Sequence, residues 1–117
     1  MEEVVAVLDY IELPARSVAA QKGFYSKAFG WEFTPYGDTY AAHERDPCQF
    51  ALNGTGHHQG DAALPVVRVE DIQAAYAAVK AAGGTITLEI FDFPGGKRFH
   101  FTDPEGQQLG VYEPAAE

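Results

Sequence analysis

Four histidines are the residues best able to bind a metal ion or to move a proton near neutral pH. His43 stands beside Glu44, His57 and His58 are adjacent, and His100 stands between two phenylalanines. Adjacent residues of extended chain point in opposite directions, so neither pair is expected to place both groups on one metal. We expect His57 and His58 in an exposed loop and His43 on a strand surface. For His100 two roles stay open, contact with a ligand or a structural hydrogen bond.

Two tyrosines and one pair of opposite charges are the further candidates for ligand binding. Tyr10 and Tyr112 can stack on a ligand or donate a hydrogen bond to it, or they can serve as packing. Glu12 and Arg68 can orient a polar ligand or form a salt bridge with each other. Cys48 has no base partner in the pattern and is expected to be idle.

Gly110 is an unusual residue for its position. It interrupts the strand-like run "QQLGVYE", which follows the turn "DPEG". A glycine weakens a strand because it leaves no side chain to pack and adds backbone entropy in the unfolded state. The missing side chain at Gly110 predicts a place where something else needs room, such as the flank of a ligand.

Two helices are predicted from apolar residues with helical spacing, over 18–29 and 72–82. The apolar stripes that we expect to be buried are Val18, Tyr25, Ala28 and Phe29 in the first, and Ile72, Ala75, Tyr76 and Val79 in the second. Ser17 and Asp71 precede these helices as N-cap candidates. Glycines follow them, at Gly30 and at Gly83–Gly84, as helix ends prefer.

The chain contains an internal repeat. One constant offset brings Ser17 onto Asp71, Gly30 onto Gly84, and Tyr10 of the run "VLDYIELP" onto Leu64 of the run "AALPVVRV". Three strand-like runs follow each helix: "WEFTPY", "TYAAHE" and "CQFALN", then "TITLEIF", "KRFHFT" and "QQLGVYE". The sequence therefore predicts one domain over 1–117 that is built from two βαβββ modules, about 1–54 and 62–115, with a polar, Gly-rich linker between them.

One helix covers only one face of a sheet, so neither module can bury its own sheet alone. We therefore expect an α+β fold with one curved sheet, both helices on one face, and a concave ligand trough on the other. Period-two alternation directs Val67, Val69, Leu109 and Val111 towards the helices, together with Val7, Ile11 and Leu13. The side chains expected to face the trough are Leu8, Tyr10, Glu12, Leu64, Val66, Arg68, Gln108 and Tyr112, with the gap at Gly110.

The segments "FYSKAFGW", "VRVEDIQAAYAAVKAAGG" and "DPEGQQLGVYEP" resemble the glyoxalase, bleomycin-resistance and dioxygenase superfamily, also called the vicinal oxygen chelate superfamily. The resemblance covers nearly the whole chain. It implies paired βαβββ modules and homodimers. In the enzymes of the superfamily it implies three or four His and Glu side chains that hold a divalent metal, which chelates vicinal oxygens of a substrate.

The metal ligands that the resemblance implies are replaced in this chain. The histidines of the first and second module fall on Tyr10 and Leu64, and the glutamate of the last strand falls on Gly110. The counterpart in the first module lies near Gln49 or Ala51. None of these residues is an imidazole or a carboxylate, so the expectation is that the protein uses no metal cofactor.

Composition limits the partners. The chain has 117 residues, a net charge of −9 and one cysteine. No basic surface for nucleic acid is visible, and no apolar run is long enough to cross a membrane. The lone cysteine and the absence of a leader pattern predict a soluble cytoplasmic protein. The acidity suits a cationic ligand, or it serves only solubility.

These features predict a metal-independent small-molecule binding protein and homodimer, with Tyr10, Glu12, Arg68, His100, Gly110 and Tyr112 lining the ligand site. The alternative is an enzyme with lyase, isomerase or dioxygenase chemistry. It would use a relocated metal site or acid–base catalysis through His100, Glu12 or Tyr10. A third hypothesis is a dimeric interaction module in which the trough is vestigial.

Overall fold

The computed structural model describes residues 5–56 and 62–116. The chain divides into two compact units. The N-terminal unit is Tyr10–Leu64, and the C-terminal unit combines Met1–Asp9 with Pro65–Glu117. Strand β1 (Ala6–Pro14) passes through both units. The prediction of a single domain remains a prediction, and each unit is described by itself below.

The N-terminal unit contains helix α1 (Val18–Phe29) and three further strands, β2 (Thr34–Pro35), β3 (Tyr40–His43) and β4 (Gln49–Asn53). The strand order is β2-β3-β4-β1, with β1 parallel to β4 and the other pairs antiparallel. Helix α1 packs on β3 and β4 over a core of Val18, Ala41 and Leu52. Leu13 and Phe50 also contact this core, which confirms the helix-facing position predicted for Leu13, whereas Val7 is 47% exposed.

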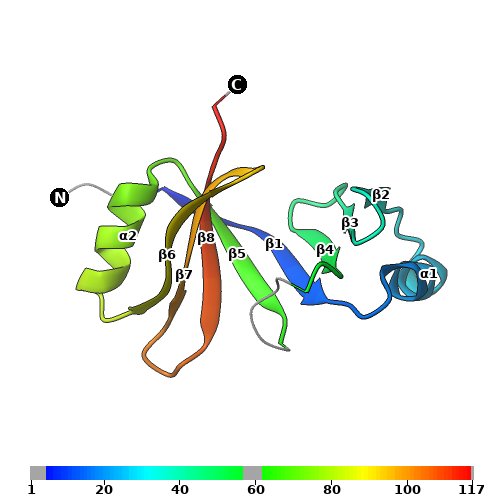
Figure 1. The fold of residues 1–117 in the computed structure, drawn as a ribbon, viewed down its shortest axis with the longest axis horizontal. Coiled ribbons are helices and arrows are strands. Elements are labelled where there is room, and N and C mark those ends of the chain that lie inside the picture. The colour runs from blue at the N-terminus through cyan, green and yellow to red at the C-terminus, as the bar shows by residue number, and fades with distance from the viewer. Residues whose placement is uncertain (1–4, 57–61, 117) are drawn as a thin grey trace. The chain divides into compact units, whose positions relative to one another are not determined.

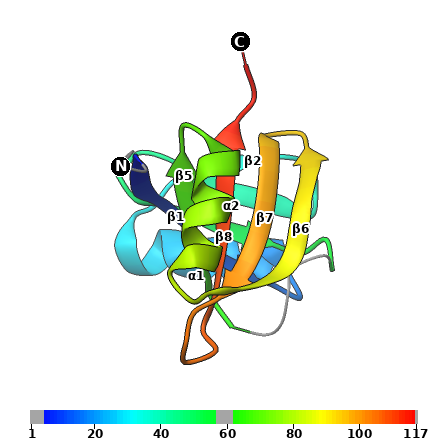
Figure 2. The same ribbon diagram turned by 90° about the vertical axis from the view of Figure 1, so that its left-hand side faces the viewer.

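The C-terminal unit contains β5 (Leu64–Val69), helix α2 (Ile72–Ala81), β6 (Thr85–Phe93), β7 (Gly96–Thr102) and β8 (Gln108–Pro114). The strand order is β5-β8-β7-β6, with β5 parallel to β8. Each unit therefore uses its strands in the order first, fourth, third, second, which confirms the internal repeat. Figure 2 shows α2 in front of β8, with β7 and β6 beside it.

The core of the C-terminal unit lies between α2 and one face of its sheet (Figure 1). Its buried members are Val69, Ile72, Ala75, Phe99 and Val111. Val67, Tyr76 and Val79 pack against them. The predicted apolar stripe of the second helix and the inward positions of Val67, Val69 and Val111 are thus confirmed.

Both helix starts are as predicted, because capping depends on local chemistry. The Ser17 side chain accepts a hydrogen bond from the backbone N–H of Ala20. The Asp71 carboxylate accepts two, from the N–H groups of Gln73 and Ala74. Helix α1 ends at Gly30 in the left-handed conformation, with φ of 72°.

Two local predictions in the N-terminal unit are wrong. The run "WEFTPY" forms only the two-residue strand β2, because Trp31 and Phe33 turn into an aromatic cluster with His43 and Phe50. The expected burial of Ala28 and Phe29 also fails. Phe29 is 62% exposed and lies against the rings of Tyr25 and Trp31 instead of entering the core.

Among the described residues, no helix combines the length and the apolar character that crossing a membrane requires.

Candidate functional site

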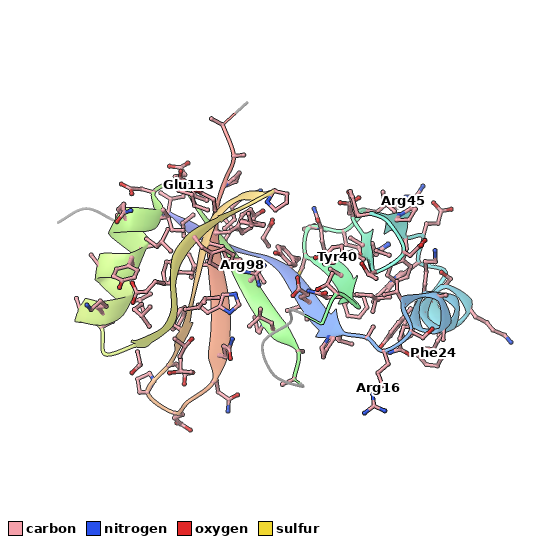
Figure 3. All side chains as sticks on the ribbon, in the orientation of Figure 1. Arg16, Phe24, Tyr40, Arg45, Arg98 and Glu113 are labelled. Atoms are coloured by element: carbon pink, nitrogen blue, oxygen red, sulfur yellow. The ribbon has the colours of Figure 1, made fainter. Side chains whose placement is uncertain are left out.

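Polar side chains gather on the face of the C-terminal sheet that is turned away from α2. We call it the distal face, defined by Arg68, Arg98, His100, Gly110 and Tyr112. The register places Arg68 and Arg98 directly opposite Tyr112, on its two neighbouring strands. Gly110 lies two positions away on the same face, directly opposite His100 on β7. Figure 3 shows Arg98 on the side of the sheet away from α2.

One hydrogen-bonded group on the distal face centres on Asp9, which is only 7% exposed. The Tyr112 hydroxyl donates a hydrogen bond to Asp9 Oδ2. Arg68 Nη1 lies 3.5 Å from Asp9 Oδ1. Because a buried carboxyl group is costly without hydrogen-bond partners, the tyrosine and the arginine together offset the burial of Asp9.

A second group centres on His100, which is 3% exposed. Arg98 Nε donates to His100 Nε2 at 2.7 Å, and the Gln108 amide lies 3.0 Å from His100 Nδ1. A guanidinium can only donate, so Nε2 must carry a lone pair and the imidazole is neutral. The proton then resides on Nδ1, and the Gln108 amide must be turned so that its oxygen, in place of its Nε2, accepts from Nδ1.

Arg98 is also held by an aromatic ring. Its guanidinium carbon lies 5.8 Å from the centre of the Phe93 ring, which is within the range of a cation–π interaction. The Phe93 ring in turn lies edge-to-face against Tyr112, with 6.1 Å between ring centres. The ring and the His100 hydrogen bond therefore fix the guanidinium from two directions.

The side chains of Arg98 and His100 border the position where Gly110 lacks a side chain. A methyl group on Gly110 would lie 3.4 Å from Arg98 Nη2 and 3.5 Å from Nε2 and Cδ2 of His100. Gly110, the residue without a side chain in this apolar strand, therefore lies beside the cationic guanidinium of Arg98. A longer side chain at Gly110 would compete with any ligand that approaches Arg98.

The residues do not fit the metal that the fold family implies. Gly110 and Leu64 have no ligand atom in their side chains, and the Leu64 residue is only 2% exposed. The fourth expected ligand position, which the sequence left near Gln49 or Ala51, is Ala51. Ala51 pairs with Glu12 in the first module as Gly110 pairs with Val66 in the second. The part of the chain that the structure describes contains no group of three or more His, Cys, Asp and Glu side chains placed to share a metal.

The remaining histidines are placed differently. His43 is buried, with Nδ1 3.1 Å from the backbone oxygen of Glu32 and Nε2 3.1 Å from Asp46 Oδ2. Its ring stacks on Trp31 at 4.9 Å on the α1 side of the sheet, so the predicted surface position is wrong. His57 and His58 lie outside the described residues.

The predicted site residues divide between the units. Arg68, His100, Gly110 and Tyr112 lie together on the distal face. Tyr10 and Glu12 belong to the N-terminal unit. There the buried Glu12 carboxylate accepts hydrogen bonds from the Tyr40 hydroxyl and the Asn53 amide, both at 3.1 Å. The ion pair that Arg68 makes is with Asp9 and not with Glu12.

Arg98, Gln108, Asp9 and Phe93 were missed as functional candidates. Arg98 precedes His100 by two residues on one strand, so the alternation that singled out His100 contained the signal for Arg98 as well. Gln108 was placed on this face but given no role. Nothing in the local pattern marks Asp9, because its partner Tyr112 is 103 residues away in the chain.

The family model of the Glyoxalase/Bleomycin resistance protein/Dioxygenase superfamily matches residues 7–111. The chain therefore belongs to this superfamily. No curated protein sequence matches the chain.

Solved structures share the fold at low sequence identity. A hypothetical protein from Bacillus halodurans C-125 has a TM-score of 0.78 at 15% identity, with 96% of each chain covered. A superfamily member from Vibrio splendidus 12B01 has 0.65 at 18%, covering 96% of this chain and 99% of its own. Methylmalonyl-CoA epimerase from Mycobacterium tuberculosis has 0.67 at 15%, covering 93% and 88%. These likenesses confirm the glyoxalase-like α+β fold.

Proposed function

We propose that the protein binds a small molecule on the distal face without a metal ion. The observation that carries this proposal is Gly110, where a methyl group would lie in ordinary contact with Arg98 and His100. The resemblance to the superfamily implies a metal-binding glutamate at this position. A divalent cation would be repelled by the Arg98 guanidinium at that position. Phe93 and Tyr112 add aromatic surface, and Gln108 adds a hydrogen-bonding group. We further propose that the protein acts as a homodimer in the cytoplasm, with neither a nucleic acid nor a membrane as partner.

Ligand screening by two-dimensional NMR tests this function. A library of anionic, neutral and cationic aromatic compounds is added to the labelled protein, and amide shifts are mapped. We expect hits that move the amide signals of His100, Gly110 and Tyr112. A Gly110→Leu variant fills the space and should lose those hits, whereas Gly23→Ala, on α1, should keep them. Hits that map only to the α2 side, or no hits at millimolar concentration, would contradict the proposal.

Elemental analysis tests metal independence separately. Untagged protein is purified without chelators, and it is also incubated with zinc, nickel, manganese and iron. We expect no stoichiometric metal in either preparation and unchanged ligand binding. A stoichiometric metal whose loss abolishes ligand binding would show that other residues, His57 and His58 among them, rebuild a metal site.

The bond between Tyr112 and Asp9 favours a second candidate function, acid–base catalysis on a small oxygenated substrate. Asp9 is positioned to accept the phenol proton, and Arg68 stabilises the carboxylate charge. Isomerase or lyase chemistry needs such a proton transfer. If turnover is found, Tyr112→Phe should lower kcat by about 10²–10⁴-fold with KM little changed. His100→Ala tests the other candidate acid–base group. Unchanged kcat in both variants would exclude this mechanism.

A further inference from the structure

We propose that helix α1 docks on the C-terminal unit of a second copy of this chain. The docking surface is the outer face of α1, which we define as Arg16, Ala20, Phe24 and Lys27. All four residues are exposed, and helical spacing places Ala20, Phe24 and Lys27 along one side of the helix. This inference rests on the proposed homodimer and names the two surfaces that meet in it.

Basic charge is concentrated on α1 and just before it. Residues 13–31 contain three basic residues and no acidic one, in a chain with 17 acidic residues. The three are Arg16, Lys22 and Lys27, and none of them forms an ion pair with another residue that the structure describes. The other five basic residues each have a partner within the chain: Arg45 with Glu32, Arg68 with Asp9, Lys97 with Asp92, Lys80 with the Tyr76 ring, and Arg98 with His100 and Phe93.

Phe24 adds an apolar side chain to this basic face. It is 59% exposed, and its ring lies edge-to-face against Tyr25, with 5.0 Å between ring centres. Figure 3 shows both Arg16 and Phe24 on the outside of the N-terminal unit. An aromatic side chain with charged residues around it is the usual pattern of a protein interface, in which the ring is buried and the charges form the rim.

The C-terminal unit has a hollow that can receive such a face. Its volume is about 330 Å³, and it is lined by residues from the start of β1, the end of β5 and the end of β8. Val5 and Val7, which are 54% and 47% exposed, give it an apolar wall together with Pro114. The Phe24 ring would cover these exposed valines.

Glu70 is the carboxylate of the hollow that is left for a partner. It is exposed and forms no ion pair with another described residue. Glu113 also lines the hollow, but it accepts a hydrogen bond from the N–H of Ile72. The positive charge of Arg68, a third lining residue, is compensated by Asp9. We therefore expect Lys27 or Arg16 of one copy to pair with Glu70 of the other.

Charge makes these the surfaces that two copies would bring together. The C-terminal unit carries 11 acidic and 4 basic residues, so copies that approach through it alone repel each other. The outer face of α1 offers the opposite charge and an apolar side chain. Burial of Phe24 supplies affinity, and the charges select which surfaces meet.

Sedimentation equilibrium of charge-reversed variants tests the contact. Lys27→Glu and Glu70→Lys should each weaken self-association about tenfold or more, because each places like charges together. An equimolar mixture of the two variants should restore it, since every contact in the mixed dimer again joins opposite charges. Lys80→Glu, in the last turn of α2, and Glu105→Lys, in the turn before β8, are the matched controls. They change the net charge equally and should leave association unchanged, alone or mixed.

The outcomes separate this inference from the proposed function. A dimer that neither Lys27→Glu nor Glu70→Lys weakens overturns the inference while the homodimer stands, and so does a mixture that restores nothing. A monomer at all concentrations overturns both. If that monomer binds phosphatidylserine vesicles or RNA through α1, the basic face belongs to that partner instead. Thermal unfolding checks the fold of every variant, and the library screen decides small-molecule binding independently.

Discussion

Gly110 is the residue of the distal face that contributes no side chain. In sequence it is a missing side chain in an apolar strand. In the structure that position lies beside a guanidinium and a neutral imidazole. Any side chain at this position would therefore meet the guanidinium and the imidazole first.

Gly110→Ala should leave the free energy of unfolding unchanged or raise it by up to about 1 kcal/mol. A methyl group meets only the ends of the Arg98 and His100 side chains, and alanine reduces the entropy of the unfolded chain. Urea unfolding measures the effect. Gly54→Ala is the matched control and should destabilise, because its methyl group would lie 2.9 Å from Val18 and 3.2 Å from the Ala15 carbonyl oxygen. Equal losses in both variants would contradict this account.

Tyr112→Phe should lower the free energy of unfolding by about 1–3 kcal/mol, because Asp9 would lose a donor while remaining buried. Tyr36→Phe removes the same kind of bond, from Tyr36 to Glu44, at an exposed site. It should change stability by less than about 0.5 kcal/mol. Chemical denaturation of both variants measures the difference. Similar values would show that burial of Asp9 does not set the strength of its hydrogen bond.

At the scale of elements, the sequence predicted what depends on neighbours in the chain. Both helices, their caps at Ser17 and Asp71 and the two-fold repeat are confirmed, because period and capping are local. The length of β2 and the exposure of Phe29 were not predictable, since they depend on how Trp31 packs. Four of the five residues that define the distal face, all but Arg98, were expected on one face of the sheet. Asp9 was missed because its contact with Tyr112 joins opposite ends of the chain.

The start of β7, where it pairs with the end of β8, depends on one glycine. Gly96 has φ of 138°, and a methyl group there would lie 2.0 Å from the Glu113 carbonyl oxygen. Gly96→Ala should cost about 2–3 kcal/mol or prevent folding. Gly23→Ala, within α1 and with open space around it, should stabilise by up to about 1 kcal/mol. Thermal unfolding compares the two, and a stable Gly96→Ala protein would show that this backbone can rearrange.

At the scale of the whole molecule, three surface groups should make stability fall in alkali. The pKa values of Tyr36 and Tyr76 are raised above 10.0 by hydrogen bonds to Glu44 and Glu89, and that of Lys97 is raised above 10.5 by its bond to Asp92. A raised pKa in the folded state adds stability that is complete below the unfolded value. It is lost as the pH rises through the folded value.

The free energy of unfolding should therefore stay level up to about pH 9 and decline above about pH 10. Denaturant unfolding across this range measures the decline, and the double variant Tyr36→Phe, Tyr76→Phe should show a shallower one. An identical decline in the double variant would assign the effect to other groups.

Sedimentation equilibrium should give twice the monomer mass if the protein is the homodimer that we propose. Phe24 and Phe29 of α1 are 59% and 62% exposed, which is unusual for large apolar side chains. Figure 3 shows Phe24 on the outside of α1. The variant Phe24→Ser, Phe29→Ser should dissociate more readily than Phe91→Ser, which changes an exposed phenylalanine of the other unit. A monomer at all concentrations would contradict the dimer.

The passage of β1 through both units has a consequence for synthesis on the ribosome. The N-terminal unit is one continuous stretch, Tyr10–Leu64, and can fold as soon as it emerges. Asp9 is made earlier, yet Tyr112 and Arg68, the residues that compensate its charge, are made later. Asp9 must therefore wait for its side-chain partners until almost the whole chain has been translated.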